Sequence, residues 1–569
     1  MRKVLLVALA TMTALGVAAL AAAGPGRTKP TTYVVVYQTG VTQASAHAAI
    51  KAAGARLLRE NKDVGVATVV SASPRFVVDA ARSSALVGAA RNIPIGHTVP
   101  AVRPKADVEK LPAIRKATKG LHLRQPARLF GADKNAEPLS PWQWDMRMIH
   151  ATPDGSYSEQ RGKKKVLVGV IDTGIDGTHP DIAPNFNSEL SRNFTTDIPL
   201  VDGPCEYASC KDPANEDDNG HGTHVASTIG SPINKIGIAG VAPDITLVNL
   251  RAGQDSGYFF LQPSVDALTY AGDHGIDVVN MSYYIDPWLY NCSANPADSP
   301  ASRAEQRTII EGTQRALDYA HAHNVTLIAA AGNNHEDEGH PTTDDSSPDY
   351  PPVANYHRVV DNTCLDLPNE GHNVISISSI GPSTRKADYS NYGLEQITVA
   401  APGGFFRDDP LWKASDPPAV RNVVAIPNQI LAAYPKNVAE ADGVLNPDGT
   451  PNTPFVVQDC NKKTCAYYQW IQGTSMASPH AVGVAALIIS EFGKNHHGKF
   501  SLAPATTEEI LRESATDTPC PVPPLHSYAD KLRPASFTAL CEGTTDLNGF
   551  YGDGIVDALR AVEKTKKHN

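Results

Sequence analysis

The chain contains the octet Gly473-Thr474-Ser475-Met476-Ala477-Ser478-Pro479-His480, which places the Ser475 hydroxyl directly before a strongly apolar segment. Residues 481–489 carry no charged side chain and predict a helix that is buried on every side. We expect Pro479 in the first turn of this helix, where no backbone donor is lost. Ser475 would then lie at the helix N-terminus, where N–H groups stabilise developing negative charge, as a nucleophile requires. A plain helix cap is the alternative.

Two other segments carry side chains that could activate a serine hydroxyl. The run Lys165–Asp172 is apolar from Val166 onward and ends in a carboxylate, the pattern of a buried parallel strand with a functional residue at its C-terminal edge. The segment Asn219-Gly220-His221-Gly222 surrounds His221 with small residues, so that the backbone can approach other chain segments closely. An Asp that orients a His, and a His that takes a proton from Ser, are the parts of a nucleophilic triad.

These three motifs, in the order Asp172, His221 and Ser475, resemble those of the subtilisin-like serine proteases, or subtilases. The resemblance extends from about Pro141 to about Val562. It implies an α/β fold, with a three-layer subtilisin-like core around a largely parallel sheet, and peptide-bond hydrolysis through an acyl-enzyme. It also implies that Asn333, after the apolar run 325–332, donates its side-chain amide to the oxyanion. A one-residue shift to Asn334 is the alternative.

The resemblance also indicates where a peptide substrate binds. One wall of the primary specificity pocket is a strand that pairs with the extended peptide by strand addition. The other wall lies on the opposite side of the pocket. Subtilases commonly carry a glycine where this chain has Tyr284, so the pocket is expected to be narrowed; aromatic packing within a strand is the alternative. The expected substrate-binding residues are Ser282, Tyr283, Tyr284, Ala330, Ala331 and Gly332.

Residues 1–23 have the pattern of a secretory signal peptide. A basic start is followed by an apolar stretch to Leu20 and then by Ala21-Ala22-Ala23. A transmembrane anchor is the alternative, but the apolar run is at the short limit for spanning and lacks the basic flank of a stop-transfer segment. We therefore expect a secreted, extracellular protein with no stable membrane anchor.

Residues 31–97 predict a small separate domain. Its apolar segments follow the order β-α-β-β-α-β, a ferredoxin-like α+β arrangement. The domain resembles the inhibitory propeptide of subtilases, and an unrelated small binding domain is the alternative. Residues 98–140 follow as a basic linker that is expected to contain the maturation site, and residues 141–569 form the catalytic domain.

The charge distribution agrees with an inhibitory segment. Residues 1–140 contain 20 Lys and Arg against 7 Asp and Glu, which leaves a net charge of −23 on the remainder of a chain whose total is −10. The two parts should attract each other. A basic patch could also bind nucleic acid, but an exported precursor gives that interpretation little support, and we expect no nucleic-acid partner.

The eight cysteines, an even number in a chain expected to be exported, predict disulfides rather than zinc ligands, because no two-residue cysteine spacing occurs. Two pairs are local and two are longer-range. The expected local pairs are Cys205–Cys210 and Cys460–Cys465. The other four cysteines leave three pairings open, among which we expect Cys292–Cys364 and Cys520–Cys541.

Two insertions, at about 334–372 and 405–472, are rich in Pro, Asp and Asn. They either cover the active-site cleft or form surface excursions. Peptide-bond hydrolysis by the triad requires no cofactor. The resemblance allows structural calcium, and we leave its ligands unassigned. The acidic residues considered, which could equally be solvated, are Glu336, Asp337, Glu338, Asp344, Asp345 and Asp349, together with a loop at Asp546-Leu547-Asn548-Gly549.

The sequence therefore predicts a secreted, monomeric serine endopeptidase that is made as a self-inhibited precursor. Its partners would be a protein or peptide substrate and its own propeptide. Two alternatives remain open: a selective protease that matures one partner peptide, and a catalytically idle binding protein.

Overall fold

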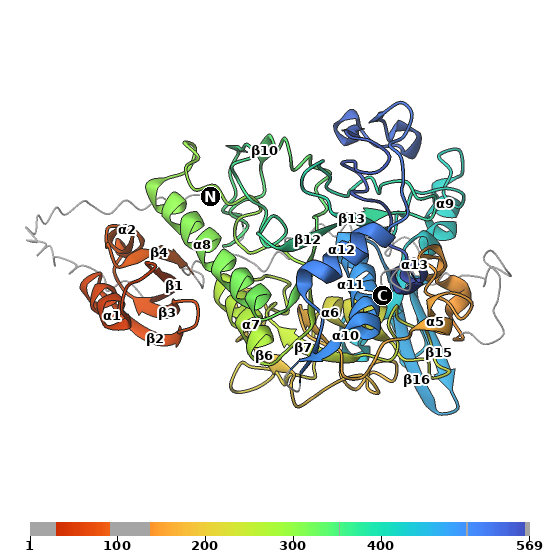
Figure 1. Cartoon of the computed structure of the whole chain (residues 1–569), viewed down its shortest axis with the longest axis horizontal. Helices are drawn as coiled ribbons and strands as arrows, with labels where there is room; N and C mark the ends of the chain where they lie inside the picture. Colours follow the sequence, from red (N-terminus) through yellow and green to blue (C-terminus); the bar gives the residue numbers. More distant parts are fainter. Residues whose placement is uncertain (1–29, 92–136, 352, 497–498, 564–569) are drawn as a thin grey trace, which may run out of the picture.

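The fold is described from a computed structural model, which covers residues 30–91, 137–351, 353–496 and 499–563 (Figure 1). The predicted signal peptide and residues 98–136 of the predicted linker lie outside these ranges.

A seven-stranded parallel sheet forms the centre of the large domain, with the strand order β13-β12-β9-β8-β5-β7-β6. Its inner strands consist almost entirely of buried residues, as expected for a parallel sheet covered on both faces. The strands are β5 (Leu167–Ile171), β6 (Arg192–Asn193), β7 (Thr246–Arg251), β8 (Val278–Met281), β9 (Thr326–Ala330), β12 (Val374–Ile380) and β13 (Val399–Pro402).

Helices cover both faces of this sheet, which confirms the predicted three-layer α/β fold (Figure 1). The helices α7 and α8 pack together on one face, and α6, α11, α12 and α13 pack on the other. Their bounds are α6 (His221–Gly230), α7 (Leu261–Asp273), α8 (Pro300–Ala322), α11 (Thr474–Phe492), α12 (Pro504–Ser514) and α13 (Ala558–Glu563). Short elements complete the domain: α4 (Trp144–Met148), α5 (Ser156–Glu159), β10 (Thr343–Asp344), β11 (Arg358–Val359), β17 (Lys494–His496), β18 (Lys499–Ser501), β19 (Leu525–His526) and β20 (Ala539–Leu540).

Helix α11 is the predicted all-round buried helix, and every residue from Thr474 to Ser490 is buried. Within the described ranges it is the one helix whose length and apolar composition would suffice to cross a membrane, and 89% of its apolar window is buried inside the domain. The apolar composition of α11 therefore matches its place in the core.

The strands of the second predicted insertion are part of the core and not a surface excursion. Its strands form an antiparallel sheet in the order β14-β16-β15, and its apolar residues join the main core beside α6. Two backbone contacts fix it there: Ser227 Oγ accepts from Ala433 N at 2.8 Å, and the His224 ring lies 3.0 Å from Gln469 O. The elements are α9 (Pro418–Val424), β14 (Ile430–Ala433), α10 (Lys436–Ala441), β15 (Val456–Asn461) and β16 (Thr464–Ile471).

The small N-terminal domain has the predicted β-α-β-β-α-β order. Its four antiparallel strands are arranged as β2-β3-β1-β4, the ferredoxin-like pattern. The elements are β1 (Thr31–Tyr37), α1 (Gln43–Ala52), β2 (Ala55–Asn61), β3 (Val66–Ser71), α2 (Phe76–Ala81) and β4 (Leu86–Arg91).

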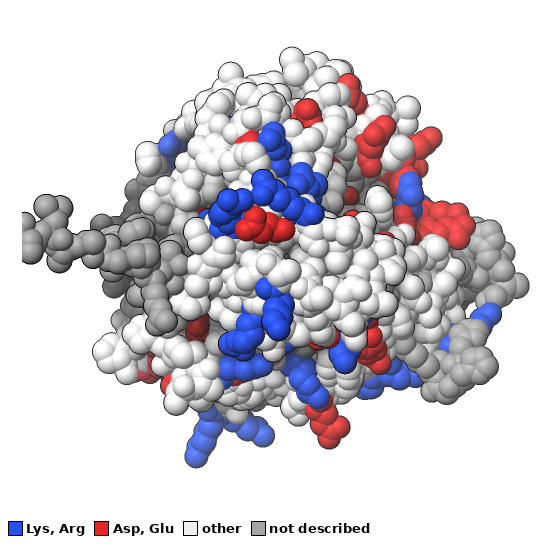
Figure 2. Space-filling model, turned by 90° about the vertical axis from the view of Figure 1, so that its left-hand side faces the viewer, with Lys and Arg blue, Asp and Glu red and all other residues white. Residues whose placement is uncertain are grey.

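This domain packs with its sheet against α7 and α8 (Figure 1). Val34 and Val36 belong to the same buried cluster as the apolar residues of the two helices. Arg91 donates to both carboxylate oxygens of Glu305, at 2.6 and 3.0 Å. Residues 31–91 carry seven Lys and Arg against three Asp and Glu, and basic side chains are spread over the middle and lower parts of the face shown in Figure 2.

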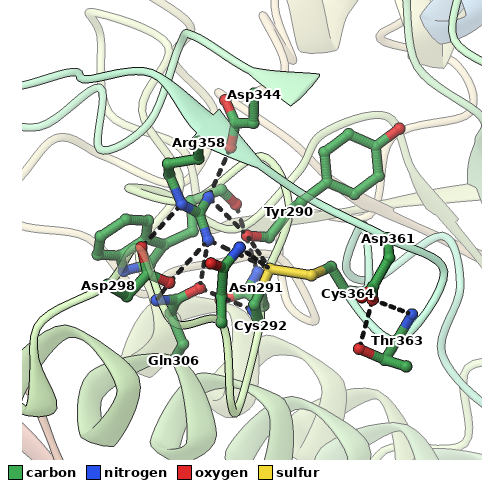
Figure 3. Close-up of a disulfide and its surroundings, with 12 residues drawn as sticks. Tyr290, Asn291, Cys292, Asp298, Gln306, Asp344, Arg358, Asp361, Thr363 and Cys364 are labelled. Atoms are coloured by element: carbon green, nitrogen blue, oxygen red, sulfur yellow. Dashed lines mark hydrogen bonds and ion pairs between the residues drawn. A yellow bond between two sulfur atoms is a disulfide. The ribbon is translucent and has the colours of Figure 1, made fainter. Parts of the chain in front are cut away.

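All four predicted disulfides are present: Cys205–Cys210, Cys292–Cys364, Cys460–Cys465 and Cys520–Cys541. The Cys292–Cys364 bond lies beside the buried guanidinium of Arg358, which pairs with Asp298 and Asp344 (Figure 3). It connects residues 72 positions apart, whereas Cys460–Cys465 connects residues 5 apart.

The longer loop should make the Cys292–Cys364 bond the more stabilising of these two. On loop-closure entropy, we expect the Cys292→Ala/Cys364→Ala variant to lose about 4 kcal/mol of unfolding free energy and the Cys460→Ala/Cys465→Ala variant about 2 kcal/mol. Urea unfolding in a Ser475→Ala background, which prevents self-digestion, measures both. Equal losses would contradict the loop-length argument.

The Arg91–Glu305 pair should hold the small domain in place. Arg91→Ala leaves the buried Glu305 carboxylate without its cation, so the interface should weaken by about 2–3 kcal/mol. Faster hydrogen exchange in α7 and α8 would report the change. Arg82→Ala removes an exposed arginine that pairs within its own domain, with Asp79, and should leave the exchange unaltered.

Candidate active site

Asp172 and His221 meet where β5 ends and α6 begins. His221 Nδ1 lies 2.7 Å from Asp172 Oδ1, which also accepts from Thr173 N at 2.7 Å. The Asp172 side chain is fully buried and the His221 side chain is 12% exposed. A Cβ on Gly222 would lie 2.1 Å from Gly174 O, so glycine is required for α6 to approach the strand end this closely.

Ser475 lies in the first turn of α11 and is bonded to the end of β8. Ser282 Oγ donates to Ser475 O at 3.1 Å, and Ser475 Oγ donates to Ser282 O at 3.4 Å. Asn280 extends this network, since it donates to Ser282 Oγ and accepts from Ser478 Oγ, both at 2.8 Å. The nucleophile expected from the sequence is thus fixed to the sheet by a hydrogen-bond network.

The expected place of Pro479 was wrong. Helix α11 begins at Thr474, so Pro479 lies inside the helix, beyond the first turn. Proline has no N–H to donate to the carbonyl four residues earlier, which is that of Ser475. The Ser282 hydroxyl supplies a donor to that carbonyl instead, and the helix continues past the proline.

Asn333 follows β9 and is oriented by Thr474. Asn333 Oδ1 accepts from Thr474 N and from Thr474 Oγ1, both at 2.9 Å. Thr474 Oγ1 in turn accepts from Gly332 N at 3.1 Å. Because Thr474 holds the amide oxygen, the amide nitrogen is directed away from Thr474. Sequence reasoning did not assign Thr474 this role, although it lies within the octet that identified Ser475.

The parallel sheet brings these residues to one edge. Ile171 is in register with Met281, and Met281 with Ala329, so the strands leading to Asp172, Ser282 and Asn333 end side by side. Ser475 reaches this edge through Ser282. A carboxylate–imidazole pair, a hydroxyl at a helix N-terminus and an oriented amide are the groups required for acyl transfer.

The residues expected to bind substrate divide into two kinds. The Tyr283 ring stacks on Phe259 with ring centroids 4.2 Å apart and is buried, so it packs in the core. Tyr284 instead donates to Asp349 Oδ2 at 2.6 Å and lines a cavity of about 260 Å³. The first insertion supplies part of this cavity, whose lining is Ser256, Gly257, Tyr258, Tyr284, Ser346, Asp349, Val353 and Asn355. On the other wall, Ala330 and Ala331 are buried and Gly332 is half-buried.

The acidic residues of the first insertion do not form one metal-ligand set. Asp344 pairs with Arg358, Asp349 accepts from Tyr284, and Glu338 accepts from Asn369 and Asn391.

Carboxylates that fit a calcium ion occur elsewhere in the described chain. Ligand oxygens lie within 4.8 Å of one another in two groups, Asp197–Glu206–Asp255 and Asp212–Asp218–Asp255. Both oxygens of Asp197 and Asp212 are buried without a hydrogen bond, and Arg251 is the cation paired with them. Burial, followed by mutual repulsion among the carboxylates, raises the pKa of Asp197 to about 7 and that of Asp255 to about 8. Oxygen-only, electron-rich sites of this kind suit calcium. The acid-rich stretch before His221 was the signal that sequence reasoning missed.

Comparison with known proteins identifies the family of this chain independently of the site geometry. The family model described as "Subtilase family" matches residues 163–552. Fervidolysin from Fervidobacterium pennivorans is 26% identical over 379 residues, which cover 65% of this chain and 41% of fervidolysin. Subtilisin DY from Bacillus licheniformis is 25% identical over 327 residues, which cover 58% of this chain and 77% of that protein.

Solved structures share the fold. The epidermin leader peptide processing serine protease of Staphylococcus aureus superposes with a TM-score of 0.60 at 19% identity, over 94% of this chain and 98% of that one. The crystal structure of fervidolysin gives a TM-score of 0.53 at 20% identity, over 95% of this chain and 61% of that one. At these identities the likeness concerns the fold alone.

The two neighbouring asparagines should differ sharply on substitution. Asn333→Ala removes the amide oriented by Thr474 and should lower kcat for peptide hydrolysis by roughly 10²–10³, a magnitude that comes from a member of this family, with little change in KM. Asn334→Ala should stay within a few-fold of the unsubstituted protein. Steady-state kinetics on one peptide compares them, and a larger loss at Asn334 would place the oxyanion donor one residue later.

Proposed function

Because the chain belongs to the subtilase family of serine proteases, we propose that it is a secreted endopeptidase whose catalytic triad is Asp172, His221 and Ser475. The observation that carries the assignment is the Asp172–His221 contact of 2.7 Å at the same sheet edge to which Ser282 fixes Ser475. An idle binding protein would have no need to keep this buried carboxylate paired with a partly exposed imidazole.

The proposed reaction begins when Ser475 Oγ attacks the scissile carbonyl carbon. His221 accepts the hydroxyl proton at Nε2, because Nδ1 is held by Asp172, and then gives that proton to the leaving amine. The Asp172 carboxylate balances the charge of the imidazolium. Water, deprotonated by His221, then attacks the acyl carbon, and His221 returns that proton to Ser475 Oγ as the bond between Oγ and the acyl carbon breaks.

The negative oxygen of each tetrahedral intermediate requires donors that are already in place. We assign these to the Asn333 amide and the Ser475 N–H, with the positive end of the α11 dipole behind them. Thr474 orients Asn333 before substrate binds, so little reorganisation is needed during the reaction.

The small domain at residues 31–97 is proposed to be an inhibitory propeptide, and the protein a self-inhibited monomeric precursor. Its packing on α7 and α8, its positive charge and the Arg91–Glu305 pair support this role. Proteolysis within 98–140 would separate it from the catalytic domain.

The alternative of a selective maturation protease is favoured by the first insertion. Its residue Asp349 joins Tyr284 in lining a cavity next to the proposed substrate-binding strand. A tyrosine held at this position would limit the side chains that a substrate can present there. An enzyme that degrades many proteins would gain nothing from that limit.

Structural calcium is proposed at the carboxylates of Asp212, Asp218 and Asp255 or of Asp197, Glu206 and Asp255. A bound divalent cation would neutralise carboxylates that Arg251 alone does not balance. It would take no part in the hydrolysis.

The experiment that tests the function compares the unsubstituted chain with Ser475→Ala after secretion. N-terminal sequencing and cleavage of a peptide library should give a shortened, active protein beside an uncut, inactive variant. Equal processing of both would mean that another protease matures the chain. Hydrolysis by the variant at the unsubstituted rate would remove Ser475 from the mechanism.

A further inference from the structure

The two proposed pocket walls, Ser282–Tyr284 and Ala330–Gly332, are both linked to the Thr474–Ser475 dipeptide. The segment around Asp366 is bonded to the continuation of the first wall, since Ile285 N donates to Leu367 O at 2.8 Å. Asp366 also adjoins the second wall. A Cβ built on Gly332 would lie 3.4 Å from Asp366 Oδ2. The Asp366 carboxylate therefore lies beside Gly332 of the second wall, on a segment that is bonded to the continuation of the first wall.

This region has more hydrogen-bond acceptors than donors. Asp366 and Asn369 are each 3% exposed, yet Asp366 Oδ1 and Asn369 Oδ1 have no hydrogen-bond partner. The neighbouring amide nitrogens are already engaged. Asn391 Nδ2 donates to Ala331 O and Glu338 Oε1, and Asn369 Nδ2 donates to both oxygens of Glu338. Buried acceptors without donors are costly, which points to a ligand that brings N–H groups.

The same region also places three acidic side chains close together, those of Glu338, Asp366 and Glu370. Burial, with mutual repulsion, raises the pKa of Glu338 and Asp366, and burial raises that of Glu370 to about 7. Across the described ranges, no Lys or Arg forms an ion pair with any of these three residues. The nearby Arg358 is already paired with Asp298 at 3.0 Å and Asp344 at 2.7 Å. The Tyr290 hydroxyl, which points away from Arg358 (Figure 3), is a buried donor without a hydrogen-bond partner beside these acidic groups, but it carries no charge to balance them.

We propose that Asp366 is a specificity-determining residue that binds the ammonium or guanidinium group of a Lys or Arg side chain at the residue preceding the scissile bond. This inference rests on the proposed function. Lys and Arg provide only donors, carry the missing charge, and have long apolar stems that can lie between the Ser282–Tyr284 and Ala330–Gly332 walls.

A metal ion fits this site less well than an organic cation. In the part of the chain that the structure describes, the oxygens of Glu338, Asp366 and Glu370 do not form a group within 4.8 Å, unlike those of Asp212, Asp218 and Asp255. A guanidinium or ammonium group donates in several directions, so it can satisfy acceptors that are spread more widely.

The test measures kcat/KM for peptides that differ only in the residue before the cleaved bond: Arg, Lys, Leu, Phe or Glu. The unsubstituted enzyme should prefer Arg and Lys by at least about tenfold. Asp366→Asn should lower kcat/KM for those two by roughly 10- to 100-fold, the range for loss of a buried charge-assisted bond, and change the Leu peptide by less than about threefold. Asp361→Asn is the matched control, because Asp361 is an exposed carboxylate on the same segment that accepts from Thr363. It should leave the profile unchanged.

Three further measurements distinguish failure of this inference from failure of the proposed function and from metal binding. Labelling of Ser475 by a fluorophosphonate, with cleavage after Leu or Phe rather than Arg or Lys, would overturn this inference and leave the proposed function standing. Absence of labelling and of all cleavage would overturn both. Should Asp366→Asn fail to fold, p-aminobenzamidine must compete with substrate in the unsubstituted enzyme while the neutral p-aminobenzamide does not; equal behaviour of the two would refute the proposal. Loss of one bound Ca²⁺ in Asp366→Asn, measured by calorimetry, would assign the site to a metal instead.

Discussion

The pair of hydrogen bonds between Ser282 and Ser475 is the contact on which the rest of the site depends. It joins the end of β8 to the first turn of α11 and replaces the helix bond that Pro479 cannot make. Because β8 lies between β5 and β9, the same junction sets the position of Ser475 relative to both Asp172 and Asn333. A helix that is buried from Thr474 to Ser490 cannot shift without disturbing the core. The Ser475 hydroxyl therefore keeps a fixed position relative to the sheet.

Thr474 connects the first turn of α11 to the end of β9 as well. Its hydroxyl and its N–H both bond Asn333 Oδ1, and the hydroxyl also accepts from Gly332 N. Two adjacent residues of α11 therefore fix two different strand ends. This explains why a short octet carries so much of the information about the site.

The sequence was sufficient for features that depend on local chemistry. The buried strands that lead to Asp172 and Asn333, the fully apolar helix after Ser475, the order of elements in the small domain and the four disulfides are all present in the structure. Each follows from a pattern within a few residues, except the two longer-range disulfides, for which the sequence left three pairings of four cysteines open.

Features that depend on tertiary contacts were not predictable in the same way. Proline was expected only in a first turn, because the Ser282 hydroxyl that compensates for it lies almost two hundred positions away in the chain. Residues 405–472 are rich in polar and turn-forming types, yet their strands enter the core beside α6. The acidic groups most suited to calcium come from positions as far apart as Asp197 and Asp255, so spacing alone could not assemble them.

Electrostatics links two parts of the proposed substrate-binding region. Tyr284, at a position where the family resemblance implies glycine, donates to Asp349, while Asp366 lies beside Gly332 with no cation paired to it among the described residues. A narrowed entrance alone would favour small side chains, and an acidic floor alone would favour any cation. Together they favour a side chain that is thin along its stem and positively charged at its end, which describes lysine and arginine better than any other residue. The negative charge of the catalytic domain would attract such substrates, as it would attract the basic segment that precedes it in the chain.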